Sequence, residues 1–371
     1  EGGSENVCFI HVTLLPMVKA AGEIKTKPTQ QSVAKLREIG IQPDIIICRT
    51  EHHLDDDNRR KIAMFCNVGK KNVVAFRDVE NTIYECPLDL RKDKIDRLVV
   101  DSLGLQSKTP NLSEWQSFVD RLVSPSKSTS IAVVGKYIEL NDAYKSIYES
   151  LTIAGAEHDT RVNIIKIDAE DLEKESAQTI IGNVNGILVP GGFGERGTEG
   201  KILAAQYARE NKIPYLGICL GMQIATIEFA RNVCGLAGAN STEFNKETEH
   251  PVISLQEEQQ GIVDMGASMR LGSCSSTIYP GTKSYDFYGQ TDTIHERHRH
   301  RWEFNPSYRE QLEKCGLTVA SVSQNEGLVE IIEIADHPFF IGTQFHPEFK
   351  SKPNQPHPLF SGLIAASLEN S

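Results

Sequence analysis

Apolar runs alternate with helix-like patterns along the first third of the chain. Three of these runs are predicted to be strands, at residues 7–15, 44–48 and 72–76. Between the first two, a helix that stops at Gly40 is predicted by apolar residues at helical spacing, namely Val33, Leu36 and Ile39. Strands separated by helices favour βαβ units on a parallel sheet.

A helical pattern covers residues 93–123, and the character of the chain then changes. One helix face carries Ile95, Leu98 and Val99, and a second carries Trp115, Phe118, Val119 and Leu122. The polar run 124–130, Ser-Pro-Ser-Lys-Ser-Thr-Ser, is typical of a linker. We therefore predict one domain at residues 1–123 and another at residues 131–371.

The second domain repeats the alternation of strands and helices. Strands are predicted at residues 131–134, 162–167, 186–190, 215–218 and 339–345. The stretch before the last of them is richer in strands and turns. The predicted fold class is α/β, with two domains built on mainly parallel sheets and with antiparallel additions in the second.

Composition narrows the classes of function. Lys and Arg number 39 against 50 Asp and Glu, a net charge of −11, so general binding to nucleic acid is disfavoured. No apolar run approaches the roughly 20 residues of a membrane helix, and no signal peptide is visible. The eight cysteines form no C-x-x-C pair. Buried or reactive thiols in a reducing cytosol are therefore favoured, and we expect a cytoplasmic protein.

A glycine-rich segment at residues 192–197 matches the G-x-G-x-x-G pattern of dinucleotide sites. Such a site also needs an acidic residue about 20 positions later, and residues 215–221 contain none. We therefore reject the dinucleotide interpretation, although the glycines still indicate a close approach of the backbone to another group.

The strongest chemical signal is Gly217-Ile218-Cys219-Leu220-Gly221, between an apolar strand and a predicted helix. The G-x-C-x-G spacing is the thiol counterpart of the nucleophile elbow, in which a sharp turn lifts the side chain out of the sheet. The helix N-terminus would favour the thiolate, and the Leu220 N–H would face a developing oxyanion. A buried cysteine between small residues is the alternative, but the two glycines at this spacing favour a nucleophile.

A cysteine nucleophile needs a base, and the base needs an orienting group. Both follow the last predicted strand, as His346 and Glu348 on either side of Pro347. An extended backbone at the proline would project the imidazole and the carboxylate to the same side, where they can pair. Alone, His-Pro-Glu could be a surface turn; with the elbow it completes a Cys-His-Glu triad.

Three segments together resemble the class I glutamine amidotransferases: residues 190–194, 217–223 and 345–349. The resemblance implies a flavodoxin-like second domain. It further implies that Cys219 attacks the side-chain amide of glutamine, that ammonia leaves, and that water hydrolyses the thioester. The N–H groups of Gly192 and Leu220 would form the oxyanion hole.

Further segments, spread over essentially the whole chain, resemble the CTP synthase family: residues 25–30, 240–244 and 296–301. This resemblance assigns Glu243 and Arg301 to the α-amino and α-carboxylate groups of L-glutamine, with Gln223 nearby. An anion and a guanidinium suit a zwitterionic substrate. The basic run at residues 297–301 could instead be a surface strand or an RNA-binding patch. The acidic net charge of the chain disfavours RNA binding.

Residues 25–30 also have a physical interpretation as an anion site. Two lysines, two threonine hydroxyls and a proline at an expected first helical turn indicate phosphate binding at a helix N-terminus, although a solvated loop has the same composition. The resemblance implies that UTP, or the feedback inhibitor CTP, binds Lys25, Thr26, Lys27, Pro28, Thr29, Gln30 and Lys61.

Weaker matches concern the other nucleotides. Arg77 and Val79 match positions that line the adenine of ATP, and Lys145 and Arg196 match residues linked to activation by GTP. The resemblance implies ATP with Mg²⁺ in the complete enzyme, no prosthetic group, and a homotetramer that can stack into filaments. No residue of this chain indicates a metal site or an assembly.

The chain departs from the family at its start. CTP synthases begin with a glycine-rich phosphate loop and magnesium-binding carboxylates, and we find neither in the sequence. We therefore expect the chain to begin inside the synthetase domain and to be competent at most for the glutaminase half of the amination of UTP to CTP. Two other hypotheses stay open: a stand-alone cysteine hydrolase of γ-glutamyl bonds, and a non-catalytic regulatory or filament-forming subunit with an inert Cys219.

Overall fold

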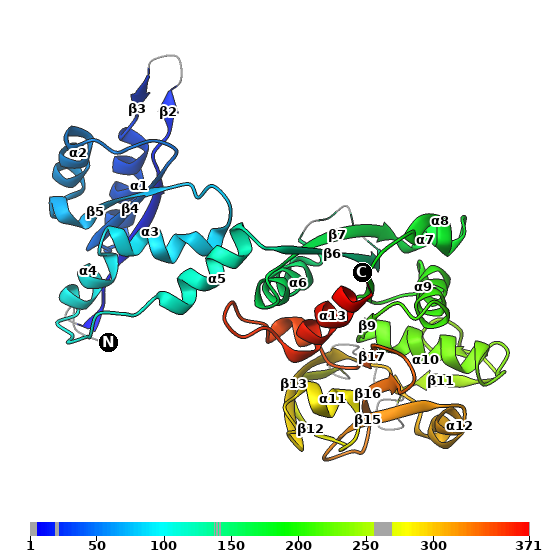
Figure 1. Cartoon of the computed structure of the whole chain (residues 1–371). Helices are drawn as coiled ribbons and strands as arrows, with labels where there is room; N and C mark the ends of the chain where they lie inside the picture. The colour runs from blue at the N-terminus through cyan, green and yellow to red at the C-terminus, as the bar shows by residue number, and fades with distance from the viewer. Residues whose placement is uncertain are drawn as a thin grey trace. The chain divides into compact units, whose positions relative to one another are not determined.

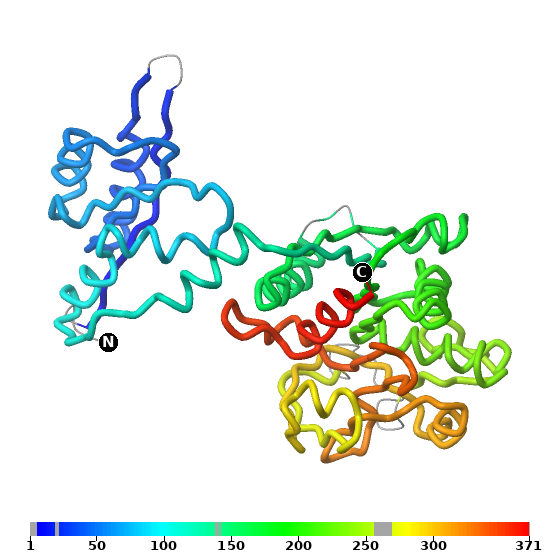
Figure 2. The backbone as a smooth tube through the Cα atoms, in the orientation of Figure 1, coloured from blue at the N-terminus to red at the C-terminus, as the bar shows by residue number. Residues whose placement is uncertain are grey.

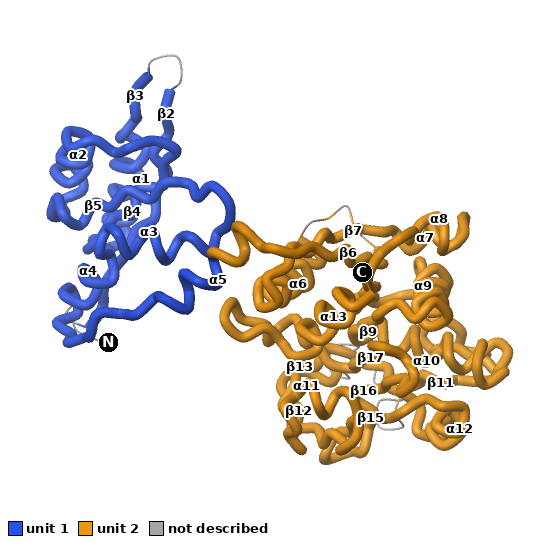
Figure 3. Tube along the Cα trace, viewed as in Figure 1, with its two compact units in different colours: residues 1–119 blue, residues 120–371 orange. Residues whose placement is uncertain are grey.

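The computed structural model describes residues 6–18, 22–136, 138, 140, 142–255 and 269–370. The chain divides into two compact units, Glu1–Val119 and Asp120–Ser371 (Figure 3). The division falls within the helix α5 (Ser113–Val123).

Unit 1 is built on a three-stranded parallel sheet in the order β1-β4-β5 (Figure 1). Its elements are β1 (Ile10–Leu14), β2 (Met17–Val18), β3 (Glu23–Ile24), α1 (Lys27–Glu38), β4 (Ile45–Thr50), α2 (Asp56–Cys66), η2 (Lys70–Asn72), β5 (Val73–Arg77), η3 (Ile83–Glu85), α3 (Cys86–Lys92), α4 (Ile95–Ser102) and most of α5. Its core joins Val33 of α1 and Ile62 of α2 to Ile46 of β4. Pro28 stands in the first turn of α1, where its missing N–H costs no helical hydrogen bond.

Unit 2 is built on one sheet of nine strands, in the order β13-β12-β15-β16-β17-β9-β8-β6-β7. The strands from β17 to β7 run parallel, and those from β13 to β17 pair antiparallel. Its elements are β6 (Lys127–Gly135), α6 (Lys145–Glu157), β7 (Thr160–Asp168), α7 (Ala169–Leu172), α8 (Ala177–Ile181), β8 (Gly186–Val189), α9 (Thr198–Glu210), β9 (Tyr215–Ile218), α10 (Leu220–Asn232), β10 (Asn240–Ser241), β11 (Pro251–Ser254), β12 (Arg270–Ile278), α11 (Lys283–Phe287), β13 (Thr293–His300), β14 (Glu303–Phe304), η5 (Pro306–Tyr308), α12 (Arg309–Lys314), β15 (Leu317–Ser323), β16 (Val329–Ile334), β17 (Phe340–Thr343), η6 (Pro347–Phe349) and α13 (Pro358–Glu369). The predicted α/β class with antiparallel additions is confirmed.

Helices cover both faces of the parallel half of this sheet. Alternate residues of β6 point to opposite faces, so Val134 packs with α9 and α10 while Val133 packs with α6 and α13. The helices α6 and α13 come from opposite ends of the unit and lie side by side (Figure 2). Because both faces are covered, the parallel strands read as continuous apolar runs.

Two predicted boundaries were wrong. The proposed linker 124–130 is mostly strand, because β6 begins at Lys127 and pairs with β7 from Thr160 onward. Its Ser and Thr residues are polar in composition, yet Thr129 is buried in this pairing. The last predicted strand, 339–345, ends as β17 at Thr343, and the chain then leaves the sheet toward η6.

None of the helices in the described part of the chain is both long enough and apolar enough to cross a membrane. The eight cysteines are all free thiols.

Candidate active site

Cys219 occupies the turn between β9 and α10, and its backbone is strained. Its φ of 52° and ψ of −100° lie in a region that L-residues rarely adopt. The flanking glycines are required by space, because a Cβ at Gly217 would lie 2.5 Å from the Gly221 carbonyl oxygen, and one at Gly221 would lie 2.1 Å from that of Val189. The Cys219 N–H donates to the Thr343 carbonyl at 2.6 Å. The spacing seen in the sequence therefore builds a rigid elbow at the carboxyl edge of the sheet.

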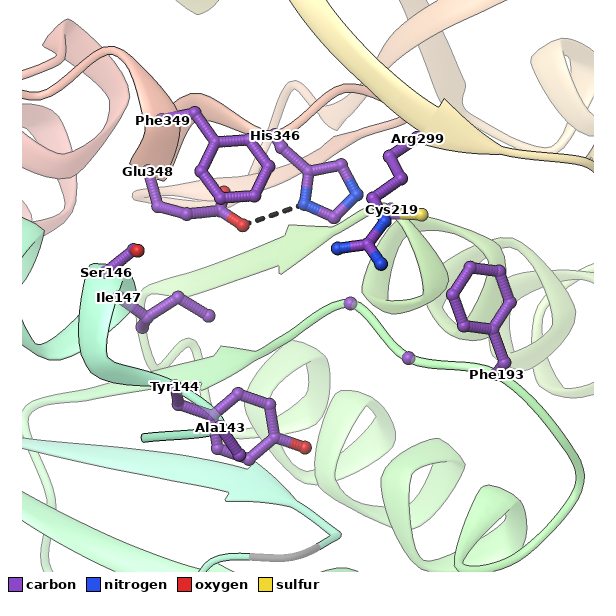
Figure 4. Close-up of a pocket in the computed structure, with 12 residues that line it drawn as sticks. Ala143, Tyr144, Ser146, Ile147, Phe193, Cys219, Arg299, His346, Glu348 and Phe349 are labelled. Carbon is purple, nitrogen blue, oxygen red and sulfur yellow. Dashed lines mark hydrogen bonds and ion pairs between the residues drawn. The ribbon is translucent and has the colours of Figure 1, made fainter. Parts of the chain in front are cut away.

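The imidazole and the carboxylate of the predicted triad are hydrogen-bonded. His346 Nδ1 and Glu348 Oε1 lie 2.7 Å apart (dashed line in Figure 4), and both side chains are buried. The backbone differs from the prediction, since Pro347–Phe349 form the 3-10 turn η6 rather than an extended segment. A proline suits the start of such a turn because its fixed φ is also helical.

The surroundings of His346 favour its charged form. Burial lowers the pKa of His346, but the Cys219 thiolate and the Glu348 carboxylate outweigh this effect and raise the value to about 10. The charge of the Cys219 sulfur and its hydrogen-bonding interaction with the ring both favour the protonated form of His346. Phe349 stacks on the ring at 5.2 Å between centroids.

These groups border a cavity of about 180 Å³ (Figure 4). Its walls come from the start of α6, the glycine loop after β8, the elbow and the η6 turn. Gly192 of this loop lies close to Leu220, since a Cβ on it would be 3.5 Å from Leu220 Cδ2. Leu220 is the first residue of α10, where backbone N–H groups have no partner within the helix. Gly192 and Leu220, the two residues predicted to form the oxyanion hole, therefore lie close to each other near Cys219.

The predicted glutamine-binding residues Glu243 and Gln223 lie at different depths below the cavity surface. Glu243 accepts a hydrogen bond from the Gly194 N–H at 2.8 Å, in the loop that lines the cavity. Burial raises the pKa of Glu243, against the opposing effects of this hydrogen bond and of Lys136 and Lys201. Gln223 lies deeper and is 3% exposed, with its amide bound inside the protein rather than in the cavity.

The arginines of β13 lie on one face of the strand. Burial alternates along it, so His298 and His300 are buried while Arg297 and Arg299 are exposed. Arg299, which the sequence analysis did not single out, lines the cavity next to Cys219 (Figure 4). Arg301 lies beyond the strand, over the Trp302 ring, and its Nε has no partner among the described residues. The period-two alternation of Arg and His could have indicated that the arginines share a face.

The two residues predicted to be linked to GTP lie apart. Lys145 is exposed at the start of α6, between Tyr144 and Ser146, which line the cavity. Arg196 pairs with Glu170 and borders a separate hollow of about 630 Å³ at the start of α9. The structure brings only the first of them to the edge of the triad cavity.

In unit 1 the predicted UTP and CTP residues gather at the start of α1. Lys25 forms an ion pair with Glu23 at 2.6 Å, and this hydrogen bond is the main cause of a lowered Glu23 pKa, to which the charge of Lys61 adds. Lys27 and Pro28 are exposed in the first turn of α1. Positive charge from two elements is thus concentrated at a helix N-terminus.

The threonines of this segment have structural partners. Thr29 is fully buried and lies 3.2 Å from the Thr13 hydroxyl, and Thr26 accepts a hydrogen bond from Gln30 at 3.1 Å. The Thr29 hydroxyl therefore joins α1 to β1, and the Thr26 hydroxyl closes the first turn of α1. A bound phosphate would face the lysines and the backbone N–H groups.

The predicted adenine residues lie at the end of β5. Arg77 is the last residue of the strand, and Val79 lies two positions after it. A hollow of about 370 Å³ opens at the carboxyl ends of β1 and β4, where Arg49 pairs with Asp78 at 2.7 Å. The carboxyl edge of a parallel sheet is the usual place for a ligand.

Comparison with known proteins shows the family to which both parts of the chain belong. The family described as Glutamine amidotransferase class-I matches residues 139–366, and CTP synthase N-terminus matches residues 1–105. CTP synthase of Methanocaldococcus jannaschii is 55% identical over 372 residues, which cover 99% of this chain and 68% of that protein. CTP synthase of Carboxydothermus hydrogenoformans is 54% identical over 367 residues, with the same coverage.

A solved structure gives the same result for unit 2. The glutaminase domain of Trypanosoma brucei CTPS, with bound acivicin, is 40% identical with a TM-score of 0.61, and the match covers 65% of this chain and 94% of that one. The fold and the matched family define a class I glutamine amidotransferase. More narrowly, the chain belongs to the CTP synthase family of glutamine-hydrolysing ligases, which make CTP.

The match over residues 1–105 corrects one expectation. The absence of a phosphate loop from the sequence predicted a chain competent at most for the glutaminase half. Residues 1–105 match the CTP synthase N-terminus, so the chain carries the synthetase domain as well, and that expectation is not supported.

Proposed function

We propose that unit 2 hydrolyses L-glutamine by nucleophilic catalysis at Cys219. The thiolate attacks the γ-carboxamide carbon, the Gly192 and Leu220 N–H groups bind the oxyanion, and His346 gives a proton to the departing ammonia. Water then attacks the thioester while His346 takes its proton, and glutamate leaves. The observation that carries this proposal is the 2.7 Å hydrogen bond between His346 and Glu348, beside the strained Cys219 elbow in one cavity.

The polar end of glutamine binds between the glycine loop and β13. Arg301 takes the α-carboxylate, supported by its Nε, which has no protein partner among the described residues. Arg299 offers a second guanidinium on the cavity wall. Glu243 takes the α-amino group while it also holds the Gly194 N–H. Gln223 supports the site from behind the cavity wall, because its side-chain amide donates to the Trp302 carbonyl and to Gln344.

The ammonia is used for the ATP-dependent amination of UTP to CTP. Lys25, Lys27 and Lys61 bind the phosphates of UTP, or of CTP as inhibitor, at the N-terminus of α1. ATP lies against Arg77 and Val79. In the described ranges, no group of three His, Cys, Asp or Glu side chains could hold a metal ion.

The proposals on regulation and assembly come from the family resemblance. GTP activates the glutaminase through Lys145 and Arg196, and four copies of the chain form a tetramer that stacks into filaments. The position of Lys145 between two residues of the cavity wall supports the first of these proposals.

Ammonia release from L-glutamine tests the central proposal. We expect release by the unchanged chain, with and without GTP, and its loss in Cys219→Ala. Cys234→Ala is a matched control, because Cys234 follows the other end of the same helix and we expect full activity. Covalent labelling by a glutamine-like electrophile, located by peptide mass spectrometry, reports on the thiol without turnover. Release that survives in Cys219→Ala, or labelling that avoids Cys219, would overturn the triad.

A further inference from the structure

Gln344 places a hydrogen-bond donor on the nucleophile. This residue follows β17 directly and is completely buried. Its Nε2 lies 3.8 Å from Sγ of Cys219, within the range of a hydrogen bond to sulfur. The proposed mechanism gives this amide no part, although the residue stands two positions before His346.

The orientation of the Gln344 amide is determined by its neighbours. Gln223 Nε2 donates to the Trp302 carbonyl at 2.9 Å, and a carbonyl oxygen can only accept. The same Nε2 therefore also donates to Gln344 Oε1, at 3.2 Å. This contact turns the oxygen of Gln344 toward Gln223 and its nitrogen toward the sulfur. A reversed Gln344 amide would place its nitrogen against the Gln223 nitrogen and its oxygen against Sγ of Cys219.

Backbone hydrogen bonds hold the donor and the thiol in a constant relation. The Gln344 N–H donates to the Glu330 carbonyl at 2.9 Å, and the Cys219 N–H donates to the carbonyl of Thr343, the residue before Gln344. Cys219 and Gln344 are therefore attached to each other through one peptide unit of β17. A donor held in this way loses little entropy when it binds the thiolate.

We propose that Gln344 is a further catalytic residue, whose amide N–H donates to the Cys219 thiolate and holds it in the direction of attack. Gln223 acts through it as a positioning residue. Two groups then act on the sulfur: His346, directly before η6, supplies the opposite charge, and Gln344, directly after β17, supplies a neutral donor. A neutral donor can orient a thiolate without competing for the proton that His346 must deliver. The proposal rests on Cys219 being the nucleophile.

The test substitutes Gln344→Met, which keeps the length of the side chain and removes the donor. Alkylation of Cys219 by iodoacetamide at pH 6, followed by peptide mass spectrometry, measures thiolate reactivity without glutamine. We expect the alkylation rate to fall about threefold. Loss of the donor destabilises the thiolate, and the gain in nucleophilicity of the thiolate offsets less than half of this loss in free energy. In the glutaminase assay, kcat should fall about tenfold, as for loss of a hydrogen bond to a charged group, with KM within twofold.

Matched variants separate this effect from damage to the fold. Gln324→Met removes an exposed amide elsewhere in unit 2 and should leave both rates unchanged. If Gln344→Met melts below the assay temperature, Gln344→Leu replaces it, because leucine also suits a completely buried position and has no donor. Gln223→Met should reduce both rates, and the double variant with Gln344→Met should be no slower than Gln344→Met alone.

Unchanged or faster alkylation in a folded Gln344 variant would overturn the proposal, and so would a defect confined to KM. Additive losses in the double variant would overturn the role of Gln223. These outcomes are distinct from failure of the proposed function, which appears as ammonia release by Cys219→Ala and does not depend on Gln344.

Discussion

Gly221→Ala tests whether the close packing of the elbow is needed for catalysis. The added Cβ would lie 2.1 Å from the Val189 carbonyl oxygen and 3.0 Å from its carbonyl carbon, both backbone atoms of β8. Ordinary contact begins near 3.4 Å, so the start of α10 and the end of β8 must separate by about 1.3 Å. Overpacking of this kind costs about 1–3 kcal/mol.

The same movement would displace both residues proposed to form the oxyanion hole. Leu220 lies at the start of α10, and Gly192 lies in the loop that follows β8. Misplacement of catalytic groups by about 1 Å reduces rates about 10²-fold, so we expect a loss of this size in glutaminase kcat. The melting temperature of unit 2 should fall by several degrees, at about 2–4 °C for each kcal/mol.

Gly69→Ala is the matched control for this substitution. Its Cβ would meet no atom closer than 3.9 Å, and its backbone is not in the left-handed region. We expect unchanged glutaminase activity and unchanged or slightly raised stability. If Gly221→Ala retained the kcat and melting temperature of the unchanged protein, the argument that the elbow glycines are required by space would be refuted.

Three further predictions concern charge. Glu348→Gln removes a carboxylate that raises the pKa of His346, so the alkaline limb of kcat against pH should move from about pH 10 to lower values, and an unmoved limb would contradict the assignment. The raised pKa of His346 also stabilises the folded protein. This stabilisation is fully present below pH 6.5, the ordinary pKa of histidine, and is lost as the pH rises through about 10. Thermal melting across this pH range measures it. Arg209→Met leaves the fully buried Glu228 carboxylate without its 2.7 Å partner and should cost about 3–5 kcal/mol in urea unfolding, whereas Arg60→Met, from an exposed pair, should cost less than about 1 kcal/mol. Equal costs would show that burial does not decide the strength of these pairs.

The amino-acid sequence alone determined the elements whose physics is local. Glycines two residues either side of Cys219 predict the elbow, because only residues without a Cβ fit against Gly221 and Val189. His-Pro-Glu predicts a pairing of imidazole and carboxylate, since the two residues are near neighbours along the chain. Continuous apolar runs predict strands covered on both faces.

Only the tertiary structure decided which distant groups meet. Gln344 reaches Cys219 because β17 pairs with β9, although more than a hundred positions separate the two residues. Arg299 enters the cavity because a period-two strand places it opposite the buried histidines. The polar run at Lys127 is strand because β7 supplies a partner for its backbone hydrogen bonds. Local spacing sets the turn and the pairing of near neighbours, whereas contacts across the sheet depend on strand order and register, which a single sequence does not encode position by position.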